Sequence, residues 1–361
     1  MATNSKWPTK RLGKFAEFRN GVNYNKSSFG LGVKVVGVSD FQDYTRPRYA
    51  ELEQINPAGI VTERNILRDG DIVFVRSNGN RELIGRSLFI EKPPEEVTHS
   101  AFTIRVRFTG GNVFPKFFAY CFRTPAIRQA LTAYGGGTNI SNLNQGILNE
   151  LEVPFPPLST QRKIAAILSA YDDLIENNLR RIKILEEIAQ NLYREWLVKF
   201  RFPAHQHARF TDSPLGRIPE GWEVATVENT FAILGGGTPS KIVPEYWDEG
   251  TINWYSPTDL TATGSMFIER SGNQISEMGL KKSSARLFPP FSVMMTSRAT
   301  LGVISINITD ACTNQGFITC VPNERFPLYT LYYWLKENVE YFISLGTGAT
   351  FKEITKGVFK T

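Results

Sequence analysis

The stretch that decides the organisation of this chain is PFPPLSTQRKIAAILSAYDDLIENNLRRIKILEEIAQNLYREWLVKF, residues 154–200. No glycine or proline occurs between Pro157 and Pro203, and strong helix formers dominate the segment. It therefore predicts one long helix, with Ser159 as its N-cap. At about 1.5 Å per residue such a helix approaches about 60 Å, which is longer than a globular core requires and suits a spacer.

Apolar side chains repeat along this helix with alternating spacings of four and three residues. This heptad pattern is typical of a coiled coil, in which a seam of side chains packs against a partner helix. Ile167, Leu174 and Ile188 widen the apolar face, which favours more than one partner; the alternative is a helix lying across its own flanking domains. A buried amide at Asn178 would cost stability but fix register. The residues predicted to pack against a partner helix are Ile164, Leu168, Tyr171, Ile175, Asn178, Ile182, Leu185, Leu192 and Trp196.

The segments on either side of the helix resemble each other. The matching positions are Trp7, Gly21 and Lys26 with Trp222, Gly236 and Lys241, residues 113–122 with 325–334, and residues 134–148 with 345–359. Three similar fragments in the same order indicate a duplication, and hence the order module, helix, module. The first module leads into the long helix, whereas no second spacer helix follows the second. Either the given chain stops early or a partner chain supplies that helix.

Short β-branched and aromatic runs separated by turns predict strands in both modules. Each module then ends in an amphipathic helix, over residues 115–133 and 327–344, followed by a glycine-rich loop. We therefore expect an α+β fold, mostly antiparallel and built twice, with domains at residues 1–155 and 203–361 and the spacer helix at 156–202. A proline-containing linker, 201–221, opens the last domain. The predicted strand segments are 33–41, 71–77, 101–108, 251–257, 292–297 and 316–321.

Composition places the chain among ordinary globular proteins. It has 361 residues, of which 42% are hydrophobic and 21% charged, enough for two domains with their own cores. Its three cysteines form no CxxC pair, which argues against a secreted disulfide framework. No segment reaches the about 18 apolar residues that a membrane span requires. We therefore expect a cytoplasmic protein.

The net charge is +6, and residues 1–158 contain 20 Lys and Arg against 14 Asp and Glu. This excess favours a polyanion partner, although a solvated basic surface would have the same composition. Loops rich in Arg, Asn, Ser, Thr and Gly recur at equivalent places in both modules, and such residues contact DNA bases and phosphates. The predicted DNA-binding residues are Lys26, Arg76, Asn78, Arg81, Arg86, Asn139, Lys241, Arg298, Thr300 and Lys352.

Several fragments look like catalytic motifs but lack a required residue. GGGTPSK, residues 235–241, has Ser240 where a Walker loop needs glycine. In Phe-Pro-Pro-Phe, which resembles a methyltransferase motif, the apolar Phe288 occupies the position that must accept a hydrogen bond from the target amine. His205 and His207 have only one other histidine in the chain with which to bind a metal. We therefore expect no catalytic site, no metal and no cofactor bound by this chain.

The central segment, 154–200, and IPEGWEVATVENTF, 218–231, resemble the DNA-specificity subunit of type I restriction-modification systems. The resemblance implies two target-recognition domains, each reading one half of a split DNA site, with paired helices that set the spacer. It also implies two modification subunits that bind S-adenosylmethionine and methylate adenine, a restriction subunit that translocates and cleaves DNA, and no active site in this chain. The competing hypotheses are a coiled-coil scaffold that binds only protein and a fused methyltransferase or nuclease, against which the missing catalytic motifs argue.

Overall fold

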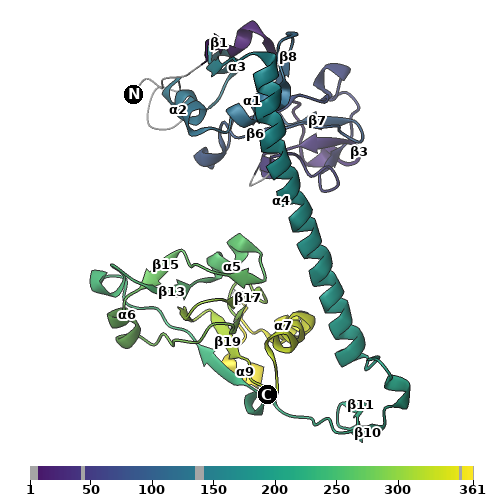
Figure 1. Cartoon of the computed structure of the whole chain (residues 1–361), viewed down its shortest axis with the longest axis vertical. Coiled ribbons are helices and arrows are strands. Elements are labelled where there is room, and N and C mark those ends of the chain that lie inside the picture. Colours follow the sequence, from purple (N-terminus) through teal and green to yellow (C-terminus); the bar gives the residue numbers. More distant parts are fainter. Residues whose placement is uncertain (1–6, 42–44, 135–141, 349–351, 361) are drawn as a thin grey trace. The chain divides into compact units, whose positions relative to one another are not determined.

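A computed structural model of the chain describes residues 7–41, 45–134, 142–348 and 352–360. Helix α4 runs from Leu158 to Tyr193 and continues as a π-helical turn over Arg194–Val198 (Figure 1). It ends before the predicted end of the helix because Phe200 adopts a left-handed backbone conformation, with φ of 54°. The contacts divide the chain into two compact units, Met1–Arg180 and Arg181–Thr361, and the boundary falls inside α4.

The first module contains two small sheets and a two-stranded ribbon. Its strands are β1 (Thr9–Arg11), β2 (Ala16–Asn20), β3 (Phe29–Val36), β4 (Gln54–Ile55), β5 (Ile72–Val75), β6 (Ser87–Phe89), β7 (Val97–His99), β8 (Thr103–Phe108) and β9 (Glu152–Pro154). In one sheet β2, β8, β5 and β6 are neighbours in that order, and all of these pairs are antiparallel. In the other, β3 is antiparallel to β4 and parallel to β7. The ribbon pairs β1 with β9 and so joins the start of the module to its end.

The second module also contains two sheets. Its strands are β12 (Ala232–Gly235), β13 (Ile252–Tyr255), β14 (Phe267–Ile268), β15 (Asn273–Ile275), β16 (Val293–Thr296), β17 (Ile304–Asn307), β18 (Ala311–Thr313) and β19 (Phe317–Val321). The larger sheet has the order β12, β19, β16, β17, β14, and the smaller has the order β15, β13, β18. Strand β13 is antiparallel to β15 and parallel to β18. Two short helices, α5 (Pro257–Thr263) and α6 (Glu277–Lys281), connect these strands.

The two modules share one strand topology. The order β2, β8, β5, β6 of the first module recurs as β12, β19, β16, β17 in the second, where β14 adds one strand at the edge. The order β4, β3, β7 recurs as β15, β13, β18, with the same antiparallel and parallel pairs. Five of the six predicted strand segments contain one of these strands, and the sixth, 33–41, overlaps only the end of β3, because residues 38–41 form a 3-10 turn. The predicted α+β architecture, two similar domains joined by a long helix, is therefore confirmed.

Gly21 and Gly236 show how closely the two backbone paths agree. Gly21 follows β2 and Gly236 follows β12, the equivalent edge strands of the two larger sheets, and each glycine passes the end of the strand that pairs in parallel, β7 or β18. A Cβ atom on Gly21 would lie 2.1 Å from the carbonyl oxygen of His99, and one on Gly236 would lie 2.0 Å from that of Asn314. Since only glycine permits this approach, the repeated glycine marks a repeated close contact between backbone segments.

The aromatic helix predicted at the end of each module is interrupted. The first is divided into α1 (Pro115–Cys121) and α2 (Pro125–Tyr134), because Pro125 lacks an amide hydrogen and starts a new helix. The second is divided into α7 (Leu328–Glu337) and α8 (Val339–Leu345), where the side-chain amide Nδ2 of Asn338 donates to the Trp334 carbonyl oxygen at 2.8 Å. A short helix follows in both modules, α3 (Gln145–Glu150) and α9 (Lys356–Lys360).

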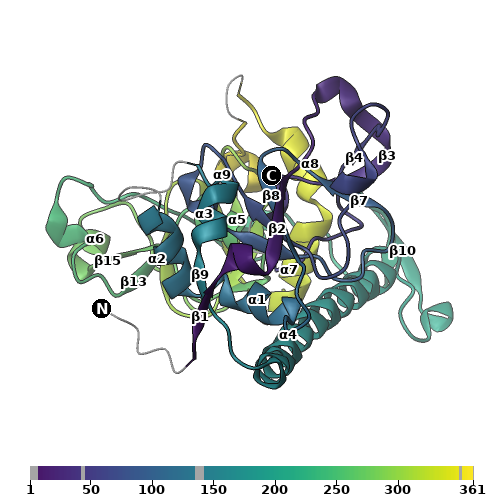
Figure 2. The ribbon, with the colours of Figure 1, turned by 90° about the horizontal axis from the view of Figure 1, so that it is seen from above.

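The predicted linker contains a β-hairpin. Within residues 201–221, β10 (Phe210–Ser213) and β11 (Gly216–Pro219) form a hairpin, so this segment has regular structure that its prolines did not predict. The first turns of α4 lie beside α1 in both views (Figures 1 and 2). Over the described residues, no helix combines the length and the apolar character needed to cross a membrane.

Candidate nucleic-acid interface and exposed helix face

In the first module, the polar loop after β5 has a fixed backbone. The Arg76 amide donates to the Phe102 carbonyl oxygen at 2.8 Å, and the Arg76 carbonyl oxygen accepts from the Leu143 amide at 2.9 Å. Asn78 Oδ1 accepts from the Asn80 amide at 3.1 Å, which closes a tight turn. The side chains of this loop therefore start from defined positions, as a surface that reads a ligand requires.

Of the other predicted DNA-binding residues in the first module, only Arg86 has a described side chain. Arg86 is half-buried, and its guanidinium donates to the Phe41 carbonyl oxygen at 3.4 Å. Lys26 and Arg81 begin the 3-10 turns Lys26–Ser28 and Arg81–Leu83, but their side chains lie outside the described atoms. Asn139 lies outside the described residues.

Two arginines that contribute to the positive excess have structural partners. Arg107 Nε and Nη2 donate to the carboxylate of Asp71 at 2.8 and 2.6 Å, and this contact raises the pKa of Arg107. Arg105, which is 3% exposed, donates to Glu17 at 2.9 Å. Both positive charges of strand β8 therefore belong to ion pairs within the module, a distinction that residue counts cannot make.

In the second module, the structure brings three predicted residues into neighbouring loops. Arg298 Nη2 donates to Glu353 Oε2 at 2.8 Å, and an isolated β-bridge joins the same two residues. The Ala299 amide donates to the Lys352 carbonyl oxygen at 3.3 Å, which places Lys352 beside the turn that contains Thr300. Both Lys352 and Thr300 are exposed. Residues that are about fifty positions apart thus form one polar surface.

Lys241 lies at a pocket of about 280 Å³ that is also lined by Trp247, Trp254 and Asn273. The Trp247 indole donates to the Ser240 carbonyl oxygen at 3.0 Å, and the Trp254 indole donates to a carbonyl oxygen of the glycine-rich loop at 2.9 Å. The two rings meet nearly at right angles, with their centroids 5.1 Å apart. Both indoles hold the loop in place, and because Trp254 is buried, the aromatic surface next to the ammonium group belongs to the partly exposed Trp247.

This pocket contains features that sequence reasoning missed. An ammonium group suits a phosphate, an amide such as that of Asn273 suits a base edge, and aromatic faces suit a stacked base. Trp254 belongs to the apolar run of β13 and reads as an ordinary core residue in the sequence. Its role in supporting the glycine-rich loop depends on contacts across the module, which no local pattern reveals.

The predicted seam of α4 divides into packed ends and an exposed middle. Ile164 packs against the core of the first module, and Ala189 and Tyr193 pack against the core of the second. Between them the seam side chains reach solvent, with Tyr171 64% exposed and Leu185 63% exposed. The exposed apolar residues of α4 and its π-helical turn are Ile167, Leu168, Tyr171, Leu174, Ile175, Leu179, Ile182, Ile184, Leu185, Ile188, Leu192, Trp196 and Val198. The exposed part contains Asn178 as well.

This apolar face is continuous along more than half of the helix. Monomeric proteins rarely expose so many neighbouring large apolar side chains, and such faces mark interaction surfaces. The alternative from the sequence, a helix that buries its seam on its own flanking domains, is met only at the two ends. Within the described part of the chain, no set of three His, Cys, Asp or Glu side chains could hold a metal ion.

A model of a known protein family matches this chain twice. The model of the type I restriction modification DNA specificity domain matches residues 4–188 and, a second time, residues 219–361. The MjaIX specificity subunit of Methanocaldococcus jannaschii is 34% identical over 167 residues, which cover 46% of this chain and 38% of that relative. A provisionally named MjaX specificity subunit from the same organism is 28% identical over 366 residues, which cover 97% of this chain and 80% of that relative.

A solved structure shares the fold. The S subunit of a type I restriction-modification system from M. genitalium aligns with a TM-score of 0.53 and 14% sequence identity, over 100% of this chain and 84% of that one. Each match of the family model covers one module, the first together with most of α4, and only residues 1–3 and 189–218 are unmatched. The chain therefore belongs to the family of type I restriction-modification DNA specificity domains.

Proposed function

We propose that this chain reads a bipartite DNA target, with one half-site for each module. The observation that carries the proposal is the repeated strand topology on either side of one continuous helix. Two copies of one recognition fold can each contact a separate segment of a duplex, and a helix gives their separation a defined length. The chain supplies recognition, whereas methylation and cleavage belong to partner subunits.

The contacts to DNA are assigned to the polar loops. Arg76, with Asn78 beside it, serves the first half-site, and the surface formed by Arg298 and Lys352 serves the second. Arg and Asn side chains form bidentate hydrogen bonds with guanine and adenine, while Lys contacts phosphates. Lys241 and the partly exposed indole of Trp247 add a position where a phosphate and a base can be held together.

The exposed face of α4 is assigned to protein partners. An apolar heptad seam next to charged flanks is suited to packing against further helices, and Asn178 within it would fix their register. Two modification subunits carrying S-adenosylmethionine, a restriction subunit and double-stranded DNA complete the proposed complex. A coiled-coil scaffold that binds only protein would use the same face but would have no DNA preference.

Selection from randomised duplexes tests this proposal. The full chain, with and without modification subunits, is incubated with the pool, and the bound sequences are determined. We expect two short conserved blocks separated by an unread spacer of fixed length. Exchange of the second module for that of a relative should change one block only. Selection of no sequence, or of one uninterrupted block, would contradict the proposal.

A further inference from the structure

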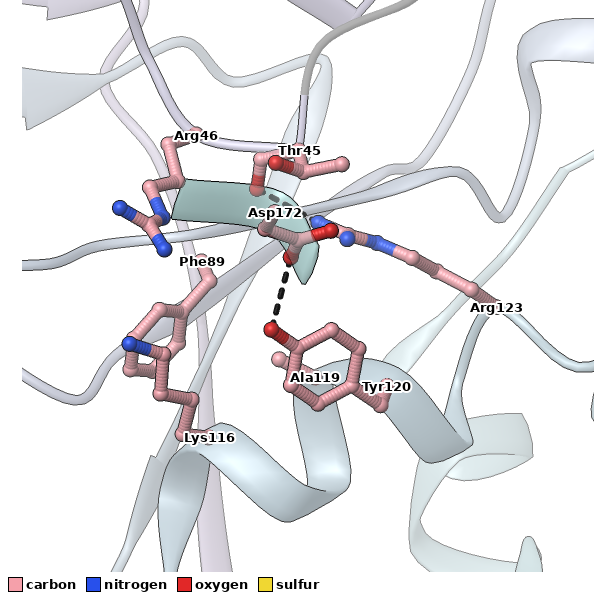
Figure 3. Close-up of a pocket in the computed structure, with 8 residues that line it drawn as sticks. All are labelled: Thr45, Arg46, Phe89, Lys116, Ala119, Tyr120, Arg123 and Asp172. Carbon is pink, nitrogen blue, oxygen red and sulfur yellow. Dashed lines mark hydrogen bonds between the residues drawn. The ribbon is translucent and has the colours of Figure 1, made fainter. Parts of the chain in front are cut away.

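A charged contact region lies where α4 leaves the first module (Figure 3). We call it the helix clamp, and it consists of Arg46, Glu91, Lys116, Tyr120, Arg123, Asp172, Asp173 and Glu176. Asp172, Asp173 and Glu176 belong to α4, whereas the other members belong to the body of the module. None of these residues is among the predicted DNA contacts or the predicted seam.

Its hydrogen bonds and ion pairs link α4 to two other segments. Tyr120 Oη on α1 donates to Asp172 Oδ2 at 2.7 Å. Arg46 lies 2.8 Å from Glu91, 3.3 Å from Asp173 and 3.8 Å from Glu176, so one guanidinium joins the module to two carboxylates of the helix. Burial alone lowers the pKa of Arg46, but these carboxylates raise it above its ordinary value.

The clamp also holds itself in shape from the side of the module. Lys116 Nζ lies 2.8 Å from Glu91, and Arg123 Nη2 donates to the Thr45 carbonyl oxygen at 2.6 Å. Arg46 and Glu91 each expose only 25% of their side chains, so solvent and salt screen their attraction less than that of a surface pair. A network of this kind restrains direction better than an isolated exposed pair.

The clamp is a second attachment point, because the start of α4 is already fixed elsewhere. Gln161 and Ala165 are fully buried in the first module. Asp172 lies eleven residues after Gln161, or about 16 Å along the helix axis. One attachment point allows a rod to tilt, whereas two separated points define its direction.

We propose that the helix clamp fixes the direction of α4 relative to the first module and thereby determines the spacer length of the DNA target. This inference rests on the proposed bipartite recognition. From Glu176 to Tyr193, α4 extends about 26 Å beyond the clamp. A tilt of about 8° at the clamp would move that end by about 3.4 Å, the rise of one base pair. Residues that contact no DNA would thus control specificity.

The clamp and the seam lie on neighbouring faces of α4. At about 100° per residue, Asp172 and Glu176 lie about 90° around the helix from Ile175 and Ile182. A partner helix can therefore pack on the seam without displacing the clamp. This separation allows the clamp to act in the assembled complex as well as in the chain alone.

The first test measures spacer preference. The full chain with its modification subunits is titrated with duplexes that contain both selected half-sites and spacers differing by one base pair. We expect Tyr120→Phe and Arg46→Ala to reduce the preference for the best spacer over its neighbours by about tenfold or more. Binding to duplexes with a single half-site should stay within about twofold. Glu187→Gln, an exposed carboxylate of α4 outside the clamp, is the matched control and should keep the wild-type profile.

The second test needs no DNA and separates this inference from the proposed function. Spin labels at Glu96→Cys and Lys183→Cys report the distance from the module to the far part of α4; the three native cysteines are buried. Arg46→Ala should broaden or shift the distance distribution, and Glu187→Gln should not. An unchanged distribution, or an unchanged spacer profile in both clamp variants, overturns the inference. A wild-type chain without any bipartite preference refutes the proposed function, while the distance measurement still decides whether the clamp directs the helix.

Discussion

Replacement of Gln161 by leucine should loosen α4 from the first module. Gln161 is fully buried, and its amide makes three hydrogen bonds to backbone groups. Oε1 accepts from the Phe114 amide at 2.8 Å, and Nε2 donates to the carbonyl oxygens of Asn112 at 3.1 Å and Pro156 at 2.9 Å. Gln161→Leu leaves these three groups without a partner, and each loss costs about 1–3 kcal/mol. The three losses together cost about 3–9 kcal/mol, and the apolar gain of leucine offsets about 1 kcal/mol; we expect a net loss near the low end of this range, about 3 kcal/mol.

Hydrogen exchange and urea unfolding measure this effect. Peptides covering residues 112–116 should exchange faster in Gln161→Leu, and the free energy of unfolding of the first unit should fall by about 3 kcal/mol. Arg162→Leu is the control because Arg162 is the exposed neighbour on the same helix, and it should change stability by less than about 0.5 kcal/mol. A loss below about 1 kcal/mol in Gln161→Leu, or unchanged exchange at Phe114, would refute the reasoning.

Substitutions at three other contacts, and a change of pH, should alter stability or DNA binding. Gly236→Ala should lower the unfolding free energy of the second unit by about 2 kcal/mol or more because its Cβ would meet backbone carbonyls. Gly357→Ala in the same unit, whose Cβ would have no atom nearer than 3.9 Å, should not, and thermal melts compare the two variants. Lys241→Ala should weaken binding to all DNA sequences alike and reduce the salt slope by about 1, whereas Lys281→Ala, on a residue paired with Glu277, should leave both unchanged in titrations. Burial lowers the pKa of His99 to about 3, so its stabilising effect is complete above pH 6.5 and is lost as pH falls towards 3; unfolding at pH 7 and 5 should differ by about 2 kcal/mol from this group, and His99→Gln should remove that difference.

The long helix and the duplication could be predicted because their signals are local or repeated. The seam from Leu168 to Leu192 keeps its spacing over several turns, so a helix satisfies it and a strand does not. Gly21 and Gly236 lie at one constant offset, and the same close backbone contact explains both. A pattern that repeats along one element needs no knowledge of distant residues.

The features that the sequence did not predict depend on contacts between residues far apart in the chain. Strands β6 and β7 are three residues long, and β7 gains its partner in β3 about sixty positions away. Arg105 and Arg107 add to the positive charge that favours a polyanion partner, but Glu17 and Asp71 lie beside them and form ion pairs with them. The indole of Trp254 reads as core, although it supports the loop before Lys241. An arginine can bind DNA or form an internal ion pair, and a tryptophan can fill a core or support a loop. Only the residues packed beside each side chain decide between these roles.

Beyond its buried start at Gln161 and Ala165, α4 contacts the first module through charged and polar side chains and leaves apolar side chains exposed. A helix that only filled a core would present its apolar stripe inwards, yet Tyr171 and Ile175 face solvent while Asp172 and Glu176 face the module. Ion pairs and hydrogen bonds hold a defined geometry because they weaken when their angles change, whereas apolar contacts tolerate sliding. The directional contacts with the first module therefore fix the direction of α4 without using its apolar face. The apolar face is then left for partners whose register a single amide, Asn178, can select.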